Sequence, residues 1–98
     1  KLIDVIKVQD ITEGDFIERE LVLAKIKTVN SAIRQEVMQL ANVFRAKVVD
    51  VGKKSLTLEI VGGTSKINAM IELLKGIGIK ELVRTGKIAM AREYNQKK

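Results

Sequence analysis

Catalytic chemistry in this chain would have to come from carboxylates, hydroxyls and lysines, because its 98 residues include no histidine and no cysteine. That absence excludes a Ser/His/Asp triad, a cysteine nucleophile and a zinc finger. Glu18 and Glu20 flank Arg19 at strand spacing, and Asp50 lies beside a predicted turn. General acid–base catalysis or Mg²⁺ binding needs such groups clustered in a cleft. We interpret these carboxylates as a solvated face and a turn partner, and we predict no catalytic residue, no metal site and no cofactor.

A glycine-rich segment is the second candidate for chemistry. Residues 62–66 have the sequence Gly-Gly-Thr-Ser-Lys and precede a predicted helix. Backbone N–H groups at a helix N-terminus favour anions, but the segment matches neither the Walker pattern nor G-x-G-x-x-G. We interpret it as a tight turn followed by a helix N-cap, with phosphate binding as the alternative.

Charge and aromatic content argue against nucleic acid as a partner. The net charge of +6 is scattered along the chain, and Lys97 and Lys98 at the C-terminal end supply two of these charges. An RNA-recognition module stacks bases on aromatic side chains of its central strands, whereas Phe16, Phe44 and Tyr94 lie outside the central predicted strands. No apolar run approaches the roughly 20 residues that span a bilayer. We predict no nucleic-acid partner, no membrane partner and a cytoplasmic location.

The spacing of apolar residues predicts an α+β fold. Strands are expected where apolar residues alternate, and helices where they recur every three to four residues. The predicted strands cover residues 2–8, 18–28, 46–51, 56–60 and 79–91, the last one interrupted at Gly86. The predicted helices begin after N-caps at Asn30 or Ser31 and at Thr64 or Ser65, and the second helix ends at Gly76 as its C-cap. Met38, Met70 and Met90 are interpreted as fillers of apolar gaps.

The order of these elements after the first strand is βαββαβ, which predicts a ferredoxin-like, ACT-like sandwich. Two helices would cover one face of a four-stranded antiparallel sheet, and the strand at residues 2–8 would precede it. Leu21 and Leu23 fall on the face opposite Val22 and Ala24. Both faces of that strand therefore need cover, and an apolar sheet face with no helix on it favours self-association or a partner.

Four blocks of sequence carry a resemblance to a known family. In order along the chain they are Glu18-Arg19-Glu20-Leu21, Phe44-Arg45-Ala46-Lys47-Val48-Val49-Asp50-Val51, Ser55-Leu56-Thr57-Leu58-Glu59 and Arg84-Thr85-Gly86-Lys87-Ile88-Ala89-Met90. Together they resemble the C-terminal domain of the small, regulatory subunit of acetohydroxyacid synthase, also called acetolactate synthase. The resemblance spans nearly the whole chain.

The resemblance implies a non-catalytic role in branched-chain amino acid biosynthesis. A small subunit of this family binds a large catalytic subunit, which uses thiamine diphosphate, Mg²⁺ and FAD. It raises the activity of that enzyme and confers feedback inhibition, commonly by valine. The resemblance further implies that residues 1–16 are the last strand and linker of an N-terminal ACT domain, and that residues 17–98 are the C-terminal domain. The effector-binding part of the ACT domain has no counterpart here, so no effector residue is carried over.

The expected partners are a second copy of the chain and the catalytic subunit. Leu21 and Leu23 are the candidates for self-association. Arg19, Arg45, Arg84 and Arg92 are candidates for partner contacts, since arginine is enriched at interfaces, although each could equally serve solubility. A second hypothesis is a stand-alone ACT-like dimer that binds an amino acid or a nucleotide at residues 62–66.

Overall fold

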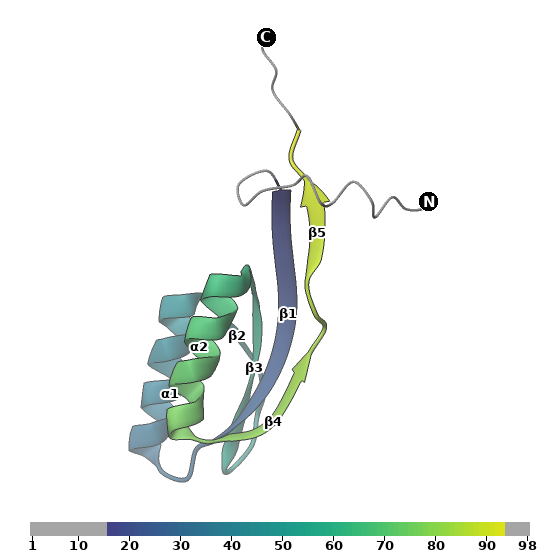
Figure 1. The fold of residues 1–98 in the computed structure, drawn as a ribbon. Helices are drawn as coiled ribbons and strands as arrows, with labels where there is room; N and C mark the ends of the chain where they lie inside the picture. The colour runs from purple at the N-terminus through teal and green to yellow at the C-terminus, as the bar shows by residue number, and fades with distance from the viewer. Residues whose placement is uncertain (1–15, 94–98) are drawn as a thin grey trace.

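Two helices cover one face of an antiparallel sheet in the computed structural model, which describes residues 16–93 (Figure 1). The elements are β1 (Phe16–Lys27), α1 (Ser31–Phe44), β2 (Lys47–Val51), β3 (Ser55–Gly62), α2 (Thr64–Ile77), β4 (Ile79–Arg84) and β5 (Ile88–Ala91). The predicted strand at residues 2–8 lies outside the described residues. None of the helices in the described part of the chain is long and apolar enough to cross a membrane.

The sheet has the strand order β2-β3-β1-β4, with β1 in its interior. In that sheet β1 pairs antiparallel with β3 on one side and with β4 on the other. This order and the two helices on one face confirm the predicted ferredoxin-like βαββαβ arrangement.

The final strand is divided in two, as the predicted interruption at Gly86 implies. Gly86 has a φ of 85°, a left-handed value that glycine adopts at little cost. β4 runs along the sheet, whereas β5 pairs with the first four residues of β1, from Phe16↔Ala91 to Arg19↔Ile88. In Figure 1, β1 and β5 continue beyond both helices. We call this pair of segments, residues 16–19 and 88–91, the β1–β5 ribbon.

The core lies between the sheet and the helices. Its fully buried members come from alternate positions of the strands and from one stripe of each helix, as the periodicity predicts. They include Val22, Ala24, Ile26, Val37, Leu58, Ile60, Ile67, Met70 and Leu74. The interpretation of the methionines holds only for Met70, because Met38 and Met90 are exposed on the outer side of α1 and on the β1–β5 ribbon.

Helix α1 begins as predicted. The side-chain oxygen of Asn30 accepts a hydrogen bond of 2.9 Å from the backbone N–H of Ile33, so Asn30 is the N-cap. The helix ends at Arg45, whose φ of 59° allows the N–H of Ala46 to bond to the carbonyl of Ala41.

Helix α2 differs from the prediction at both ends. Gly63 is its N-cap, and the hydroxyl of Thr64 bonds to Glu18 instead of capping the helix. The predicted C-cap, Gly76, lies inside the last turn, and the C-cap is Gly78 with a φ of 132°. The N–H of Gly78 bonds to the carbonyl of Leu74, and its own carbonyl accepts from Lys27 of β1. The sheet therefore decides where the helix ends, because the chain must turn at Gly78 to place β4 beside β1.

These two glycines are expected to respond to alanine in opposite ways. Gly76→Ala should stabilise the protein by roughly 0.5–1 kcal/mol, because alanine favours a helix interior and its Cβ would meet no atom within 4 Å. Gly78→Ala should destabilise it by about 1 kcal/mol or more, since the left-handed backbone there opposes an L side chain. Urea denaturation of both variants measures the difference, and equal effects would contradict the assignment of the cap.

Candidate interaction surface

The sheet face away from the helices carries apolar side chains that are only partly covered. Leu21 is half-buried and Leu23 is 39% exposed. Their cross-strand neighbours include Val61 on β3, beside Leu21, and Val83 on β4, beside Leu23. The structure therefore places Leu21 and Leu23 on the predicted face. We call this surface, including its continuation on the ribbon, the open face.

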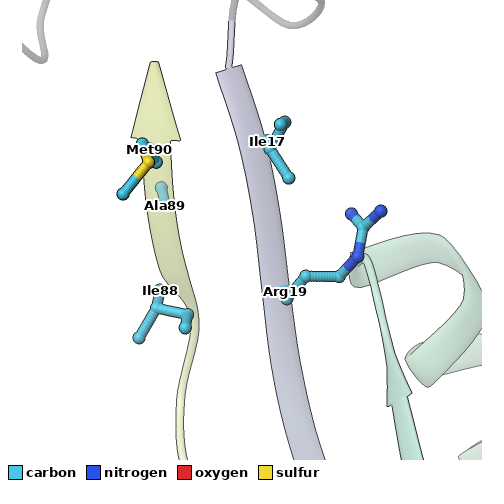
Figure 2. Close-up of a pocket in the computed structure, with 5 residues that line it drawn as sticks. All are labelled: Ile17, Arg19, Ile88, Ala89 and Met90. Atoms are coloured by element: carbon cyan, nitrogen blue, oxygen red, sulfur yellow. The ribbon is translucent and has the colours of Figure 1, made fainter. Parts of the chain in front are cut away.

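The ribbon extends the open face beyond the helices. Figure 2 shows Ile17 and Arg19 on β1 opposite Ile88 and Met90 on β5. These four side chains and Ala89 line a shallow hollow, and Ile88 and Met90 are 72% and 75% exposed. A second hollow follows along the same face, lined by Arg19, Glu20, Leu21, Val61, Thr85 and Ile88. Apolar surface thus continues from the ribbon to the middle of the sheet, as at surfaces that bind a protein.

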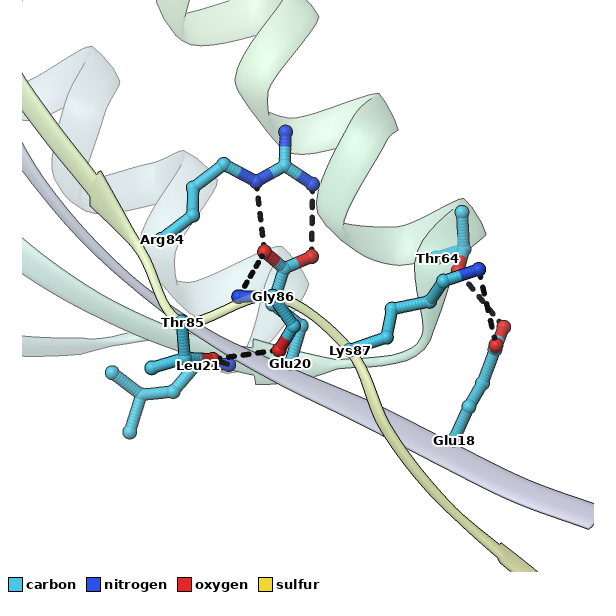
Figure 3. Close-up of polar contacts among 8 residues, drawn as sticks. All are labelled: Glu18, Glu20, Leu21, Thr64, Arg84, Thr85, Gly86 and Lys87. Carbon is cyan, nitrogen blue, oxygen red and sulfur yellow. Dashed lines mark hydrogen bonds and ion pairs between the residues drawn. The ribbon is translucent and has the colours of Figure 1, made fainter. Parts of the chain in front are cut away.

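Glu20 organises the crossing from β4 to β5 (Figure 3). Its two carboxylate oxygens accept from Nε and Nη2 of Arg84 at 2.9 and 2.8 Å, and one of them also accepts from the N–H of Gly86 at 3.1 Å. These bonds, those from Arg84 first, lower the pKa of Glu20. The side chain is only 5% exposed, so the interpretation as a solvated face is wrong for Glu20. The reason is that β4 brings Arg84 to it from 64 residues away.

The side chain of Glu18 contacts Thr64, the first residue of α2. Its carboxylate accepts from the hydroxyl of Thr64 at 2.8 Å and lies 3.6 Å from Nζ of Lys87. The bond from Thr64, aided by Lys87, lowers the pKa of Glu18. The ammonium of Lys66 donates to the carbonyl of Val61. A carboxylate of the chain therefore lies where an anionic ligand of residues 62–66 would bind, and the small-molecule hypothesis gains no support from this geometry.

Asp50 is exposed on β2, and the adjacent turn is held by another residue. The guanidinium of Arg34 on α1 donates to the carbonyls of Gly52 and Lys53 at 2.8 Å each. Of the two interpretations of Asp50, a solvated group or a turn partner, its exposure fits the first, and Arg34 holds the turn instead. Among the described residues, no group of three or more acidic side chains could hold a metal ion.

Comparison with known proteins identifies the family. Residues 19–93 match the family model described as the small subunit of acetolactate synthase. The chain belongs to the acetolactate synthase small-subunit family and corresponds to its C-terminal domain. It is 53% identical over 97 residues to the acetolactate synthase small subunit of Aquifex aeolicus, covering 99% of this chain and 50% of that protein. It is 47% identical to the Bacillus subtilis small subunit, covering 99% of this chain and 56% of that protein.

A solved structure of the acetolactate synthase small-subunit family supports the fold. The crystal structure of the small subunit from Thermotoga maritima aligns with a TM-score of 0.76 and 32% identity, covering 91% of this chain and 59% of that one. Relatives also include a chloroplastic small subunit of Arabidopsis thaliana, 46% identical over 95% of this chain and 19% of that protein. The chain spans about half the length of the first two bacterial relatives.

The four candidate arginines of this small-subunit domain lie in different surroundings. Arg19 is exposed on the open face, beside Leu21, and donates to the carbonyl of Glu18. Arg45 ends α1, Arg84 is engaged with Glu20, and Arg92 is exposed just after β5. Only Arg19 thus joins Leu21 and Leu23 on one surface. A contact with a partner stays a prediction for all four.

Several members of the open face were missed by sequence reasoning. They are Ile17, Val61, Val83, Ile88 and Met90. Alternation in residues 79–91 shows that two sets of side chains exist, but only strand pairing shows which set faces away from the helices.

Proposed function

We propose that this chain acts as the C-terminal domain of a regulatory, non-catalytic subunit of acetolactate synthase. In this role it binds the large catalytic subunit, raises its activity and takes part in feedback inhibition of branched-chain amino acid synthesis. Its match to the small-subunit family over residues 19–93 carries the proposal. The open face supports it, because a sheet with exposed apolar residues suits protein contact. Glu18 and Glu20, the carboxylates near the open face, accept hydrogen bonds from Thr64 and Arg84 of the same chain, which fits a non-catalytic role.

We further propose that the residues before β1 belong to a preceding ACT domain and its linker, and that the C-terminal domain starts at β1. This boundary is one residue earlier than the one expected after residue 16, because Phe16 pairs with Ala91 of β5. The proposal is supported only by the greater length of the relatives, of which this chain spans about half. Effector binding would then belong to the ACT part. A cytoplasmic location stays a prediction.

Mixing the chain with an acetolactate synthase catalytic subunit tests the regulatory role. We expect co-elution of the two proteins and faster acetolactate formation. Valine should not slow the mixture, because this chain carries no predicted effector residue. A complete small subunit, such as that of Aquifex aeolicus, is the matched control for valine inhibition. If the two proteins do not co-elute and acetolactate formation is not faster, the proposed contact is contradicted.

The proposed homodimer forms through Leu21 and Leu23. Leu23→Lys should place a charge in this interface and yield a folded monomer, measured by sedimentation equilibrium and circular dichroism. Val43→Lys is the matched control, since Val43 is 73% exposed on α1, in the helix layer. A Leu23→Lys chain that dimerises as tightly as the unaltered protein would contradict this interface.

A further inference from the structure

Three connections of the fold meet at the end of the domain opposite the β1–β5 ribbon (Figure 1). They are residues 28–30 between β1 and α1, residues 52–54 between β2 and β3, and Gly78 between α2 and β4. The backbone N–H of Thr28 donates to the carbonyl of Lys54 at 2.9 Å. The N–H of Lys27, at the end of β1, donates to the carbonyl of Gly78 at 2.9 Å. These bonds hold side chains from distant parts of the sequence on one surface.

Four exposed lysines lie at or beside these connections, and we call their surface the lysine end. They are Lys27, Lys53, Lys54 and Lys80. Within residues 16–93, none of the four forms an ion pair. Lys25, by contrast, is paired with Glu81 at 3.4 Å. The positive charge of the lysine end is therefore not neutralised by ion pairs of the described chain.

Among the described residues, few acidic groups lie near the lysine end. Glu81 is engaged by Lys25, and Asp50 is exposed near the end of β2. Helix α1 begins at this end with no acidic residue in its first turn, and the free N–H groups of that turn add a partial positive charge. The C-terminus of α2 adds a partial negative charge, which Lys75 in its last turn offsets. The four lysines therefore outweigh Asp50, and the surface carries a net positive charge.

The chemistry of the lysine end suits an acidic protein surface. Charge of one sign steers a partner of opposite charge and opposes association with others. Val29, in the first connection, is 61% exposed, so the lysine end also offers an apolar contact. A nucleic acid fits less well, because single strands bind by stacking on aromatic side chains. Phe16 lies on the ribbon and Phe44 at the far end of α1, so neither can stack a base here.

The lysine end lies apart from the other contacts proposed for this domain. β1 begins on the ribbon, so a preceding ACT domain would be joined at the opposite end (Figure 1). The proposed homodimer uses Leu21 and Leu23. Leu23 lies roughly 13 Å before Lys27 along β1, because a strand rises about 3.4 Å per residue. The lysine end is thus free for a third contact.

We propose that the catalytic subunit docks an acidic patch of its surface on the lysine end. The inference rests on the proposed function and adds where the catalytic subunit binds and by which charges. The lysines raise the rate of association through attraction at a distance, and Val29 packs against the partner once the surfaces meet. Because salt screens exposed charges, this contact weakens as ionic strength rises.

Charge reversal in the β2–β3 connection of the full chain tests this contact. Lys53→Glu combined with Lys54→Glu should weaken binding to an acetolactate synthase catalytic subunit about tenfold or more at low salt, mainly through slower association. Lys47→Glu combined with Arg92→Glu is the matched control, because it changes the net charge equally at exposed residues outside the lysine end. Biolayer interferometry on the immobilised catalytic subunit measures both rates, and circular dichroism shows whether each variant is folded. Added salt should weaken binding of the unaltered chain more than that of the lysine variant.

Several results would overturn the lysine end as the docking surface. If the lysine variant binds as tightly as the unaltered chain, the catalytic subunit docks elsewhere and the proposed function stands. If that variant instead loses binding to a labelled oligonucleotide, the lysines contact nucleic acid. If the control variant loses as much affinity for the catalytic subunit, net charge decides binding and this surface does not. If the unaltered chain neither binds nor activates the catalytic subunit, the proposed function is wrong as well.

Discussion

Leu58→Ala is expected to lower the free energy of unfolding by about 2–5 kcal/mol, since it deletes buried methyl groups and leaves a cavity. Leu58 is fully buried on β3, between Ala24 of β1 and Val48 of β2. A domain of this size is commonly stable by only about 5–15 kcal/mol. The change would therefore remove a large share of its stability, measured by urea denaturation at one protein concentration.

The matched control for Leu58→Ala is Val61→Ala on the same strand. Val61 is 44% exposed on the open face, so its truncation should cost less than about 1 kcal/mol. Comparison of the two variants shows whether the loss of stability comes from burial between the sheet and the helices or from position on β3 alone. Similar losses in the two variants would contradict the one-sided core.

Glu20→Gln is expected to lower the melting temperature by roughly 10 °C near neutral pH. It weakens two hydrogen bonds between charged groups, and the loss of each such bond lowers the melting temperature of a small domain by several degrees. Glutamine fits the same space but removes the charge that faces Arg84. It also replaces one acceptor oxygen by an amide group that donates. Because Glu20 holds the β4–β5 crossing through Arg84 and Gly86, this variant should loosen the ribbon before it unfolds the core.

The pH dependence of stability provides a second measurement on Glu20. Arg84 and the N–H of Gly86 hold the pKa of Glu20 below its ordinary value of 4.5. The stability that the carboxylate contributes is therefore fully present above pH 4.5 and is lost as the pH falls toward the lowered pKa. Glu18 contributes with the same sign. Between pH 6 and pH 3, the melting temperature should therefore fall less steeply with decreasing pH for Glu20→Gln than for the unaltered chain.

Glu81→Gln is the matched control for the melts. Glu81 is 70% exposed in its ion pair with Lys25, and exposed ion pairs contribute little to stability. We expect the melting temperature of this variant to change between pH 6 and pH 3 as that of the unaltered chain does. If the melting temperature of Glu20→Gln also follows that of the unaltered chain, the Glu20–Arg84 ion pair does not support the acid stability of the fold.

Much of the fold follows from local pattern. Alternation of apolar residues predicts the strands, because successive strand side chains point to opposite faces, and Asn30 specifies a helix start through its own side chain. The helix end at Gly78 does not follow in this way. Gly76 and Gly78 are both suitable residues, and the hydrogen bond between Lys27 and the carbonyl of Gly78 belongs to the sheet.

The amino-acid sequence by itself determined the order of the elements, the family and the two-sided apolar character of β1 at Leu21 and Leu23. These depend on residue types at short spacing. Only the tertiary structure decided that Glu20 is buried, that the ribbon stands apart from the helices, and that Arg19 and Ile88 share the face of Leu21. Each of these depends on which strands pair and in which register, and pairing joins residues more than 60 positions apart. No local pattern specifies such a partner, because any strand of similar alternation would satisfy it equally well.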